Sequence, residues 1–376
     1  MRKTRCCCTW GWTWRTSISM HCPPTARLGN EAGRRRRRRH GRCAPRDRAA
    51  GLDAVAVAEV AADTGGVRGR GLPNRGGLWA HVPEGIDARH DMAYDPDDPD
   101  ALLDLYRPAG TPVEQALPVV VWIHGGAFIS GRRADVAPYL KILAAEGFAT
   151  VAVGYSLAPG TRYPRPLAQV NTALGWLQDN AATLGLDTSR VVLAGDSAGA
   201  QLAAQIALLA TDPAYARQVG IEPLIDASRI RATVLACGAL DLSLVDPDAS
   251  DAGAAFMRTV TWAYSGRRDF RTDPAFGLMS VAEHAGTGFP PTFITAGNAD
   301  PLLPHSRSME RRLRSFDVEV ETLFFPDDHQ PPLPHEYQFN LDTDAGRLAL
   351  ERIVDFIQRH TAGIDPDGPS RPSAPH

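Results

Sequence analysis

The sequence predicts an α/β fold in which helices cover both faces of a mostly parallel central sheet. Short continuous apolar runs recur along the chain, and such runs suit strands that are buried on both faces. Between them lie longer segments whose apolar residues recur with the helical period of 3.6. Strands that alternate with helices in this way form a parallel sheet, because each helix returns the chain to the same end of the sheet.

The first strand signal lies in residues 92–108, where the alternating Leu103 and Leu105 predict an edge strand or a hairpin. Later apolar runs, such as Val119-Val120-Val121, are typical of fully buried strands. We expect six such strands, at 118–123, 148–154, 190–194, 230–237, 291–296 and 318–325.

The helices are predicted from apolar residues that share one face. In residues 166–180, Leu167, Val170, Leu174 and Leu177 fall on one side of a helix. A glycine, Gly147, ends the first predicted helix. The expected helices span 134–147, 166–180, 198–209, 306–316 and 344–359, and the irregular stretch 243–288 is expected to be a lid insertion with helical pieces.

The two ends of the chain differ in composition from the predicted domain, residues 76–362. Residues 1–50 carry 14 Lys or Arg against 2 Asp or Glu, so the rest of the chain has a net charge of −15. We expect residues 1–75 to be a disordered basic tail or the product of a misassigned start, with a tether to nucleic acid or another anionic surface as the alternative. Residues 363–376 are expected to be a flexible tail, and the acidic domain is not expected to bind nucleic acid.

Cysteine usage indicates a reducing compartment, and we expect a cytoplasmic protein. A disulfide-stapled secreted domain would have cysteines throughout its core, but only Cys237 lies beyond the first 50 residues. The tail cysteines and histidines match no recognised zinc spacing, so we expect neither a metal nor a cofactor. No apolar stretch is long enough to span a membrane, and the sequence does not indicate an oligomeric state.

The strongest chemical signal is a serine between two glycines, at residues 195–199. Ser197 lies between the predicted strand 190–194 and the alanine-rich helix 198–209. A sharp turn between strand and helix exposes a serine hydroxyl above the sheet, and the flanking glycines let strand and helix approach closely. The helix N-terminus directs N–H groups at the same point, where negative charge is stabilised. The pattern therefore predicts that Ser197 is a nucleophile and that the amide of Ala198 helps to bind an oxyanion.

A second glycine-rich segment, residues 124–128, follows the first buried strand. Small residues there allow the backbone to turn inward and present N–H donors, which acyl transfer requires for its oxyanion. We expect the amides of Gly126 and Ala127 to serve, with Gly125 as a reserve. His124 is expected to orient the backbone rather than to act as a base.

Three motifs together resemble a known family. Residues 124–128, 155–159 and 195–199 are similar, in order, to the HGGGF, YRLAP and GDSAGG landmarks of the hormone-sensitive-lipase-like carboxylesterases, which have the α/β-hydrolase fold. The resemblance covers roughly residues 90–360 and implies a serine esterase without a cofactor. The chain departs from the family pattern at Ala127, Ser156, Gly160 and Ala200, where the family has glycine, arginine, glutamate and glycine.

The resemblance implies an acid and a base that follow the serine in the chain. Asp300 lies in a segment similar to the family's G-x-x-D-P-L, and Asp241 after the preceding strand is the competitor. The family's histidine follows an aromatic-proline pair, here Phe325-Pro326, and is often followed two residues later by an aromatic. His335 with Tyr337 fits this pattern, and His329 is the second choice.

The sequence therefore predicts a hydrolase that cleaves small carboxylic esters through an acyl-enzyme on Ser197, and the family resemblance implies short to medium acyl chains. A peptidase or amidase of the same fold is one alternative. A non-catalytic binding protein of this fold is the other, although such proteins typically lack one member of the serine, histidine and acid set.

Overall fold

One sheet of eight strands, in the order β1-β2-β4-β3-β5-β6-β7-β8, organises the described part of the chain. The computed structural model describes residues 77–246 and 252–362, all within one unit, Asp47–His376. The predictions for residues 1–75 and 363–376 therefore lie outside the described residues. The predicted α/β fold with a mostly parallel sheet is confirmed, since every neighbouring pair from β4 to β8 in that order runs parallel.

The parallel strands coincide closely with the predicted apolar runs. They are β3 (Leu117–Ile123), β4 (Ala149–Val153), β5 (Leu186–Asp196), β6 (Ile230–Ala236), β7 (Thr292–Ala296) and β8 (Val320–Phe324). Every residue of β4 and β7 is buried, as expected for strands covered on both faces. β5 is much longer than predicted, because its polar beginning at Leu186–Arg190 also pairs within the sheet.

The predicted edge hairpin at 92–108 is present, but it begins earlier. β1 (Ile86–Ala93) pairs antiparallel with β2 (Leu102–Pro108), and β2 pairs antiparallel with β4. β1 is exposed along most of its length and carries charged residues such as Asp87 and Arg89. A charged edge strand resists pairing with other chains, and it lacks the apolar alternation from which a strand is predicted.

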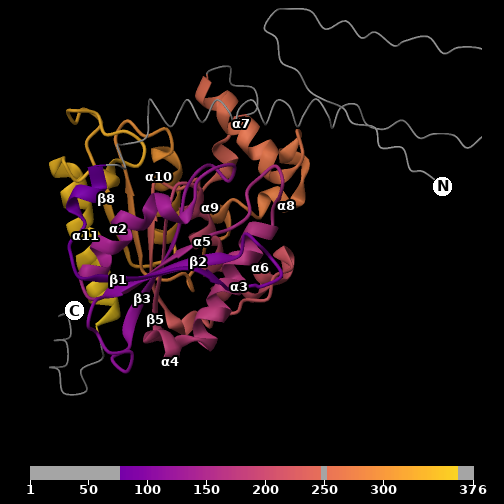
Figure 1. Cartoon of the computed structure of the whole chain (residues 1–376). Coiled ribbons are helices and arrows are strands. Elements are labelled where there is room, and N and C mark those ends of the chain that lie inside the picture. The colour runs from indigo at the N-terminus through magenta and orange to yellow at the C-terminus, as the bar shows by residue number, and fades with distance from the viewer. Residues whose placement is uncertain (1–76, 247–251, 363–376) are drawn as a thin grey trace, which may run out of the picture. The chain divides into compact units, whose positions relative to one another are not determined.

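Alternate residues of β3 enter two separate cores. Val119 and Val121 face one core with the helices α3 (Arg165–Asp179), α5 (Ala198–Thr211) and α10 (Leu303–Arg314). Val120 and Trp122 face the other core with α2 (Arg133–Ala145) and α11 (Asp344–Thr361). Figure 1 shows these two helix layers on either side of the strands.

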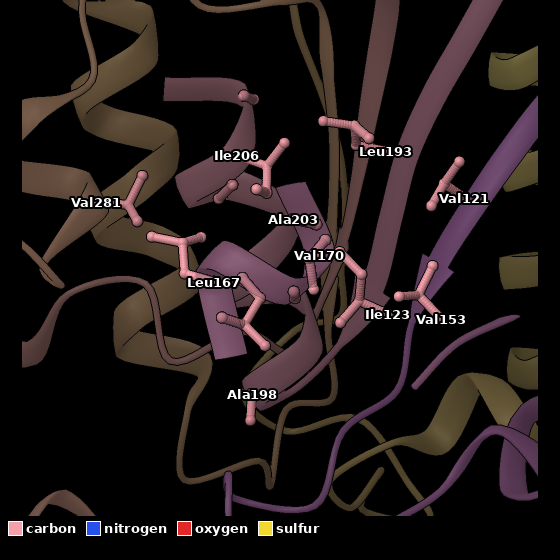
Figure 2. Packing of buried hydrophobic residues seen from close by; sticks show 14 of the residues in the cluster. Val121, Ile123, Val153, Leu167, Val170, Leu193, Ala198, Ala203, Ile206 and Val281 are labelled. Atoms are coloured by element: carbon pink, nitrogen blue, oxygen red, sulfur yellow. The ribbon is translucent and has the colours of Figure 1, made fainter. Parts of the chain in front are cut away.

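The first of these cores lies directly beneath the nucleophile turn. Leu167 and Val170 of α3 meet Ala203 and Ile206 of α5 there, as Figure 2 shows. The apolar faces predicted for α3 and α5 are therefore buried as the helical period requires. This packing fixes α5, whose first residue is Ala198, against the sheet.

The insertion between β6 and β7 is largely helical. It contains α7 (Ala252–Ser265), α8 (Pro274–Gly277) and α9 (Val281–His284), with the 3-10 turns Leu242–Leu244 and Phe270–Thr272. The remaining helices are α4 (Ala181–Leu184), α6 (Pro213–Val219) and the 3-10 turns Gly77–His81, Ala227–Arg229 and Tyr337–Phe339. Among the described residues, no helix combines the length and apolarity that crossing a membrane requires.

The strand order reverses direction at β3, because the chain goes from β3 to β4 on one side and then to β5 on the other. Loops at such a switch point diverge and leave a crevice at the carboxyl ends of the strands. The loops after β3, β5, β7 and β8 carry the residues 124–128, Ser197, Asp300 and His335, respectively. The topology thus places the predicted site residues at one edge of the sheet.

Candidate active site

Ser197 occupies the sharp turn between β5 and α5. Its φ of 53° lies in the left-handed region, which residues other than glycine rarely adopt. The turn is held by the Ser197 amide, which donates to the Ala236 carbonyl at 2.8 Å. A side chain at position 199 would clash with the carbonyls of Ile123 and His124, so Gly199 allows α5 to begin beside β3.

A chain of hydrogen bonds runs from Ser197 through His335 to Asp300. The Nε2 atom of His335 lies 3.0 Å from the Ser197 Oγ, and its Nδ1 lies 2.9 and 3.0 Å from the two Asp300 oxygens. An Nδ1 that faces a carboxylate carries the proton, so Nε2 can accept the proton of the serine hydroxyl. The structure therefore brings together the first-choice serine, histidine and acid predicted from the sequence.

Asp300 is held in place from within its own loop. Its side chain has no exposed surface, and its Oδ1 accepts from the Leu302 amide at 2.7 Å. The competing acid, Asp241, is instead surrounded by serine hydroxyls, accepting from Ser280 and Ser308 as well as from its neighbour Ser243. The structure thus joins His335 to Asp300 and gives Asp241 other partners.

The loop that carries His335 is tied to the Asp300 loop by Asn298. The Asn298 Nδ2 donates to the His329 carbonyl at 3.1 Å, and its Oδ1 accepts from the Leu333 amide at 2.8 Å. The ring of His329 packs against Phe325, with 4.8 Å between the ring centres. The structure therefore places His335, rather than the second-choice His329, against Ser197.

The surroundings of His335 favour its protonated form. Burial of the ring favours the neutral imidazole, but the hydrogen bond and the charge of the Asp300 carboxylate favour the imidazolium and hold the pKa of His335 above its ordinary value. Burial also raises the pKa of the Cys237 thiol, which is therefore neutral at pH 7. Asp300 is thus the charge that stabilises an imidazolium at this position.

Residues 124–128 form a tight turn next to Ser197. Gly126 has a φ of 118°, and a side chain there would clash with the Ser130 carbonyl. Ala127 and Phe128 also have positive φ, at 54° and 61°. Neither the Gly126 nor the Ala127 amide donates to a protein acceptor among the described residues. These two N–H groups, together with that of Ala198 at the start of α5, are available to a ligand.

The Gly125 amide is already engaged, since it donates to the Asp196 carboxylate at 3.0 Å. Gly125, named as a reserve oxyanion donor, thus holds the loop rather than presenting a free N–H. His124 also has a structural contact, because its ring stacks on Tyr155 at 4.4 Å and the Tyr155 hydroxyl donates to its carbonyl.

A cavity of about 430 Å³ opens beside Ser197 and His335. Its wall is mainly apolar and includes Phe256, Met257 and Val260 of α7. Among the described residues of the wall, the polar ones besides Ser197 and His335 are Asp246 and His305. A mainly apolar cavity with few polar groups beside a reactive centre is typical of a small-molecule site.

The structure describes one group of three possible metal ligands, which are Cys237, Asp300 and His335. Their ligand atoms lie within 4.8 Å of one another. His335 and Asp300 already form a hydrogen-bonded pair in this group, and burial keeps the Cys237 thiol protonated. The contacts of all three residues are thus explained without an ion.

A family model described as alpha/beta hydrolase fold matches residues 120–330, more than half of the chain. The chain belongs to this family. The matched segment of this α/β hydrolase contains residues 124–128, Ser197 and Asp300, whereas His335 lies five residues beyond it. The fold class predicted from the sequence is thereby confirmed a second time.

Several relatives of this α/β hydrolase are esterases from Mycobacterium tuberculosis. It is 27% identical to esterase LipQ over 71% of this chain and 61% of LipQ. It is 32% identical to carboxylesterase NlhH over 66% of this chain and 75% of NlhH. The resemblance to the hormone-sensitive-lipase-like family is also confirmed, since hormone-sensitive lipase from Bos taurus is 38% identical over 34% of this chain and 17% of that protein. This chain spans less than two thirds of LipQ.

The solved structure of esterase B from Lactobacillus Rhamnosis (HN001) has the same fold. It superposes on this α/β hydrolase with a TM-score of 0.69, at 23% identity, over 82% of this chain and 97% of the esterase. At this level of identity, the similarity establishes the arrangement of the sheet and helices alone.

Sequence reasoning missed three residues that shape the site of this α/β hydrolase. Asp196 was considered only as part of the motif at residues 195–199, but its carboxylate is fully buried. Asn298 and His305 had no recognisable signal, because their partners come from loops that are distant in the sequence. Their roles follow only from the way the loops meet.

Proposed function

We propose that this α/β hydrolase cleaves carboxylic esters through an acyl-enzyme on Ser197. The observation that carries this proposal is the hydrogen bond of 3.0 Å between Ser197 Oγ and His335 Nε2, with Asp300 bonded to the other ring nitrogen. This is the arrangement in which a serine hydroxyl becomes nucleophilic. The relatives named as esterases support the same activity.

In the first step, His335 accepts the hydroxyl proton through Nε2 as the Ser197 Oγ attacks the ester carbonyl carbon. The new C–O bond converts the carbonyl oxygen into an oxyanion. Asp300 keeps the proton on Nδ1 in the free enzyme and stabilises the imidazolium that forms. His335 then donates its proton to the leaving alcohol as the C–O bond to the alcohol breaks.

The oxyanion is bound by backbone amides in this proposal. The donors are the N–H groups of Gly126, Ala127 and Ala198, which have no competing protein acceptor among the described residues. Gly125 acts indirectly, because its amide fixes the loop to Asp196. Each such donor typically contributes about 10²- to 10³-fold to kcat.

In the second half of the reaction, a water molecule replaces the alcohol. His335 takes a proton from this water, whose oxygen attacks the acyl carbon. Collapse of the second oxyanion breaks the bond to Ser197, and the proton on His335 returns to the Ser197 oxygen. The products are a carboxylic acid and the free enzyme, and neither a metal nor a cofactor takes part.

The substrate is a small ester of short to medium chain length. The cavity of about 430 Å³ is mainly apolar, which supports an alkyl chain. Helix α7 contributes to its wall, and we propose that residues 243–288 act as a cap on the substrate. We also propose a cytoplasmic location, supported by Cys237, a free thiol within the described residues.

The test is the hydrolysis of p-nitrophenyl acetate and butyrate by the wild type and by Ser197→Ala. We expect the substitution to lower kcat by at least about 10³-fold, because no other group forms the acyl-enzyme. The matched control is Ser315→Ala, which removes an exposed hydroxyl at the end of α10 and should retain wild-type rates.

A fluorophosphonate probe adds a direct readout. Mass spectrometry should find the probe on Ser197 in the wild type and on no serine in Ser197→Ala. Parallel assays with p-nitroanilides separate an esterase from an amidase. Ester turnover equal to that of Ser197→Ala, together with no labelling, would contradict the proposal and favour a non-catalytic binding protein.

A further inference from the structure

A histidine that the reaction does not use lies in the wall of the substrate cavity. His305, near the start of α10, is 5% exposed and lines the same cavity as Ser197 and His335. Its neighbours in the wall include the apolar residues Leu244, Val245 and Leu302. A polar ring in an apolar wall needs hydrogen-bond partners, because a buried polar group without a partner is destabilising.

The protonation state of His305 follows from its partner. Its Nδ1 accepts from the Asp241 amide at 3.3 Å, so the ring proton resides on Nε2. Burial lowers the pKa of His305 to about 4, against the smaller opposing effects of Asp241 and Asp300. At neutral pH the ring is therefore an uncharged donor with its proton on Nε2.

The Nε2–H group of His305 has no acceptor among the described residues, whereas Nδ1 has one. A donor at the wall of a cavity can be satisfied by an oxygen atom of a molecule that occupies the cavity. An alkyl chain offers no such oxygen and would leave this donor without an acceptor from the substrate.

The charge of the cavity decides what kind of oxygen it accepts. His305 is neutral, so it offers a substrate oxygen a hydrogen bond without a positive charge. A carboxylate placed against this mainly apolar wall would lose its hydration without gaining a charged partner from His305, which is costly. An ether, ketone or second ester oxygen accepts a hydrogen bond without bringing a negative charge.

We propose that His305 is a specificity-determining residue whose Nε2–H binds a second, uncharged oxygen in the acyl or alcohol part of the ester. The preferred substrates are thus esters that carry an ether, keto or second ester oxygen within the reach of the cavity. This inference rests on the proposed function, because it concerns the occupant of the same site.

Two substitutions distinguish the role of His305 Nδ1 as an acceptor from the role of Nε2 as a donor. In His305→Asn, the amide oxygen replaces Nδ1 as acceptor for the Asp241 N–H, but no donor reaches the Nε2 position. In His305→Gln, the amide nitrogen reaches the Nε2 position and restores a donor there. Arg311→Gln, on the exposed side of the same helix, is the matched control.

The substrates are p-nitrophenyl heptanoate and its three analogues in which oxygen replaces the methylene at carbon 4, 5 or 6. Butyl butyrate and 2-methoxyethyl butyrate form the matched pair for the alcohol side. The measured quantity is the kcat/KM of each oxygen analogue divided by that of its alkyl partner, after correction for spontaneous hydrolysis.

We expect the wild type to prefer at least one oxygen analogue over its alkyl partner. His305→Asn should lower this ratio about 3- to 10-fold, the typical effect of one neutral hydrogen bond. His305→Gln should recover most of it, and Arg311→Gln should leave it unchanged. A loss of polarity alone would lower the ratio equally in His305→Asn and His305→Gln, and that result would contradict a specific donor.

The inference and the proposed function fail in different ways. Absence of heptanoate turnover above that of Ser197→Ala would contradict the esterase activity and, with it, the inference. Normal heptanoate turnover with no preference for any oxygen analogue in the wild type would overturn the inference alone. The wild-type ratio needs no variant, so this outcome is decisive even if His305→Asn does not fold.

Discussion

The carboxylate of Asp196 connects the turn at Ser197 to the loop at residues 124–128 through the amide of Gly125, with 3.0 Å between Oδ2 and the amide nitrogen. Its Oδ1 accepts from the Trp122 indole at 2.8 Å. Asp196 has no exposed surface, so these contacts form where water does not compete. The residue that precedes Ser197 thus helps to fix the loop that presents Gly126 and Ala127.

Asp196→Asn should lower kcat more than it raises KM. The asparagine amide turns an N–H group toward one of the two donors, so either Gly125 or Trp122 loses its acceptor. We expect a loss of about 10-fold or more in kcat with short p-nitrophenyl esters, because the oxyanion donors move from their positions. Trp122→Phe removes the other contact and should have a smaller effect. An unchanged kcat in Asp196→Asn would show that Gly125 keeps its position without the carboxylate.

Asp300→Asn should change both the rate and its pH dependence. His335 must be neutral to accept a proton, so kcat/KM falls as the pH drops through the pKa of His335. The Asp300 carboxylate favours the imidazolium and raises this pKa. Its removal therefore shifts the acid limb of the pH–rate profile to lower pH, while the plateau falls on the order of 10³- to 10⁴-fold.

The control for this profile is Asp241→Asn, which alters the other acid considered from the sequence. Asp241 interacts with three serines and His305 rather than with His335. The acid limb of the pH–rate profile of Asp241→Asn should therefore coincide with that of the wild type. A shift in Asp241→Asn instead of Asp300→Asn would exchange the roles of the two carboxylates.

The two histidines after β8 should respond very differently to replacement. His335→Ala removes the base and should lower kcat by at least about 10³-fold. His329→Ala removes a ring that packs against Phe325, so we expect activity within about threefold of the wild type. Initial rates with p-nitrophenyl butyrate distinguish the two, and an inactive His329→Ala that is well folded would contradict the assignment.

Tyr264 on α7 offers a prediction about stability. Its ring stacks on Phe128 at 4.0 Å, but its buried hydroxyl has no hydrogen-bond partner in the part of the chain that the structure describes. Tyr264→Phe removes an unsatisfied polar group and retains the stacking, so the free energy of unfolding should rise by about 1 kcal/mol. Tyr155→Phe is the matched comparison, because its hydroxyl donates to the His124 carbonyl at 2.8 Å, and it should lower stability by about as much. Urea unfolding measures both, and the same sign in the two variants would be inconsistent with this account.

The sequence by itself determined the parallel strands β3 to β8 and most of the helices that cover them. Buried strands and amphipathic helices can be predicted from local apolar patterns, such as those in residues 119–123 and 167–177. The nucleophile turn was equally local, because the glycines around Ser197 meet a steric requirement within five residues. By contrast, β1 was largely missed, since a charged edge strand is stabilised by pairing with β2 rather than by its own pattern.

Only the tertiary structure decided which residues meet at the site. The choice of His335 over His329 depends on the path of the loop after β8, which Asn298 holds from the neighbouring strand end. The engagement of Gly125 depends on Asp196, 71 residues away in the chain. The placement of the His305 ring proton on Nε2 depends on the Asp241 backbone, 64 residues away. Such contacts have no local signature, because they arise when loops from different strands converge at one edge of the sheet.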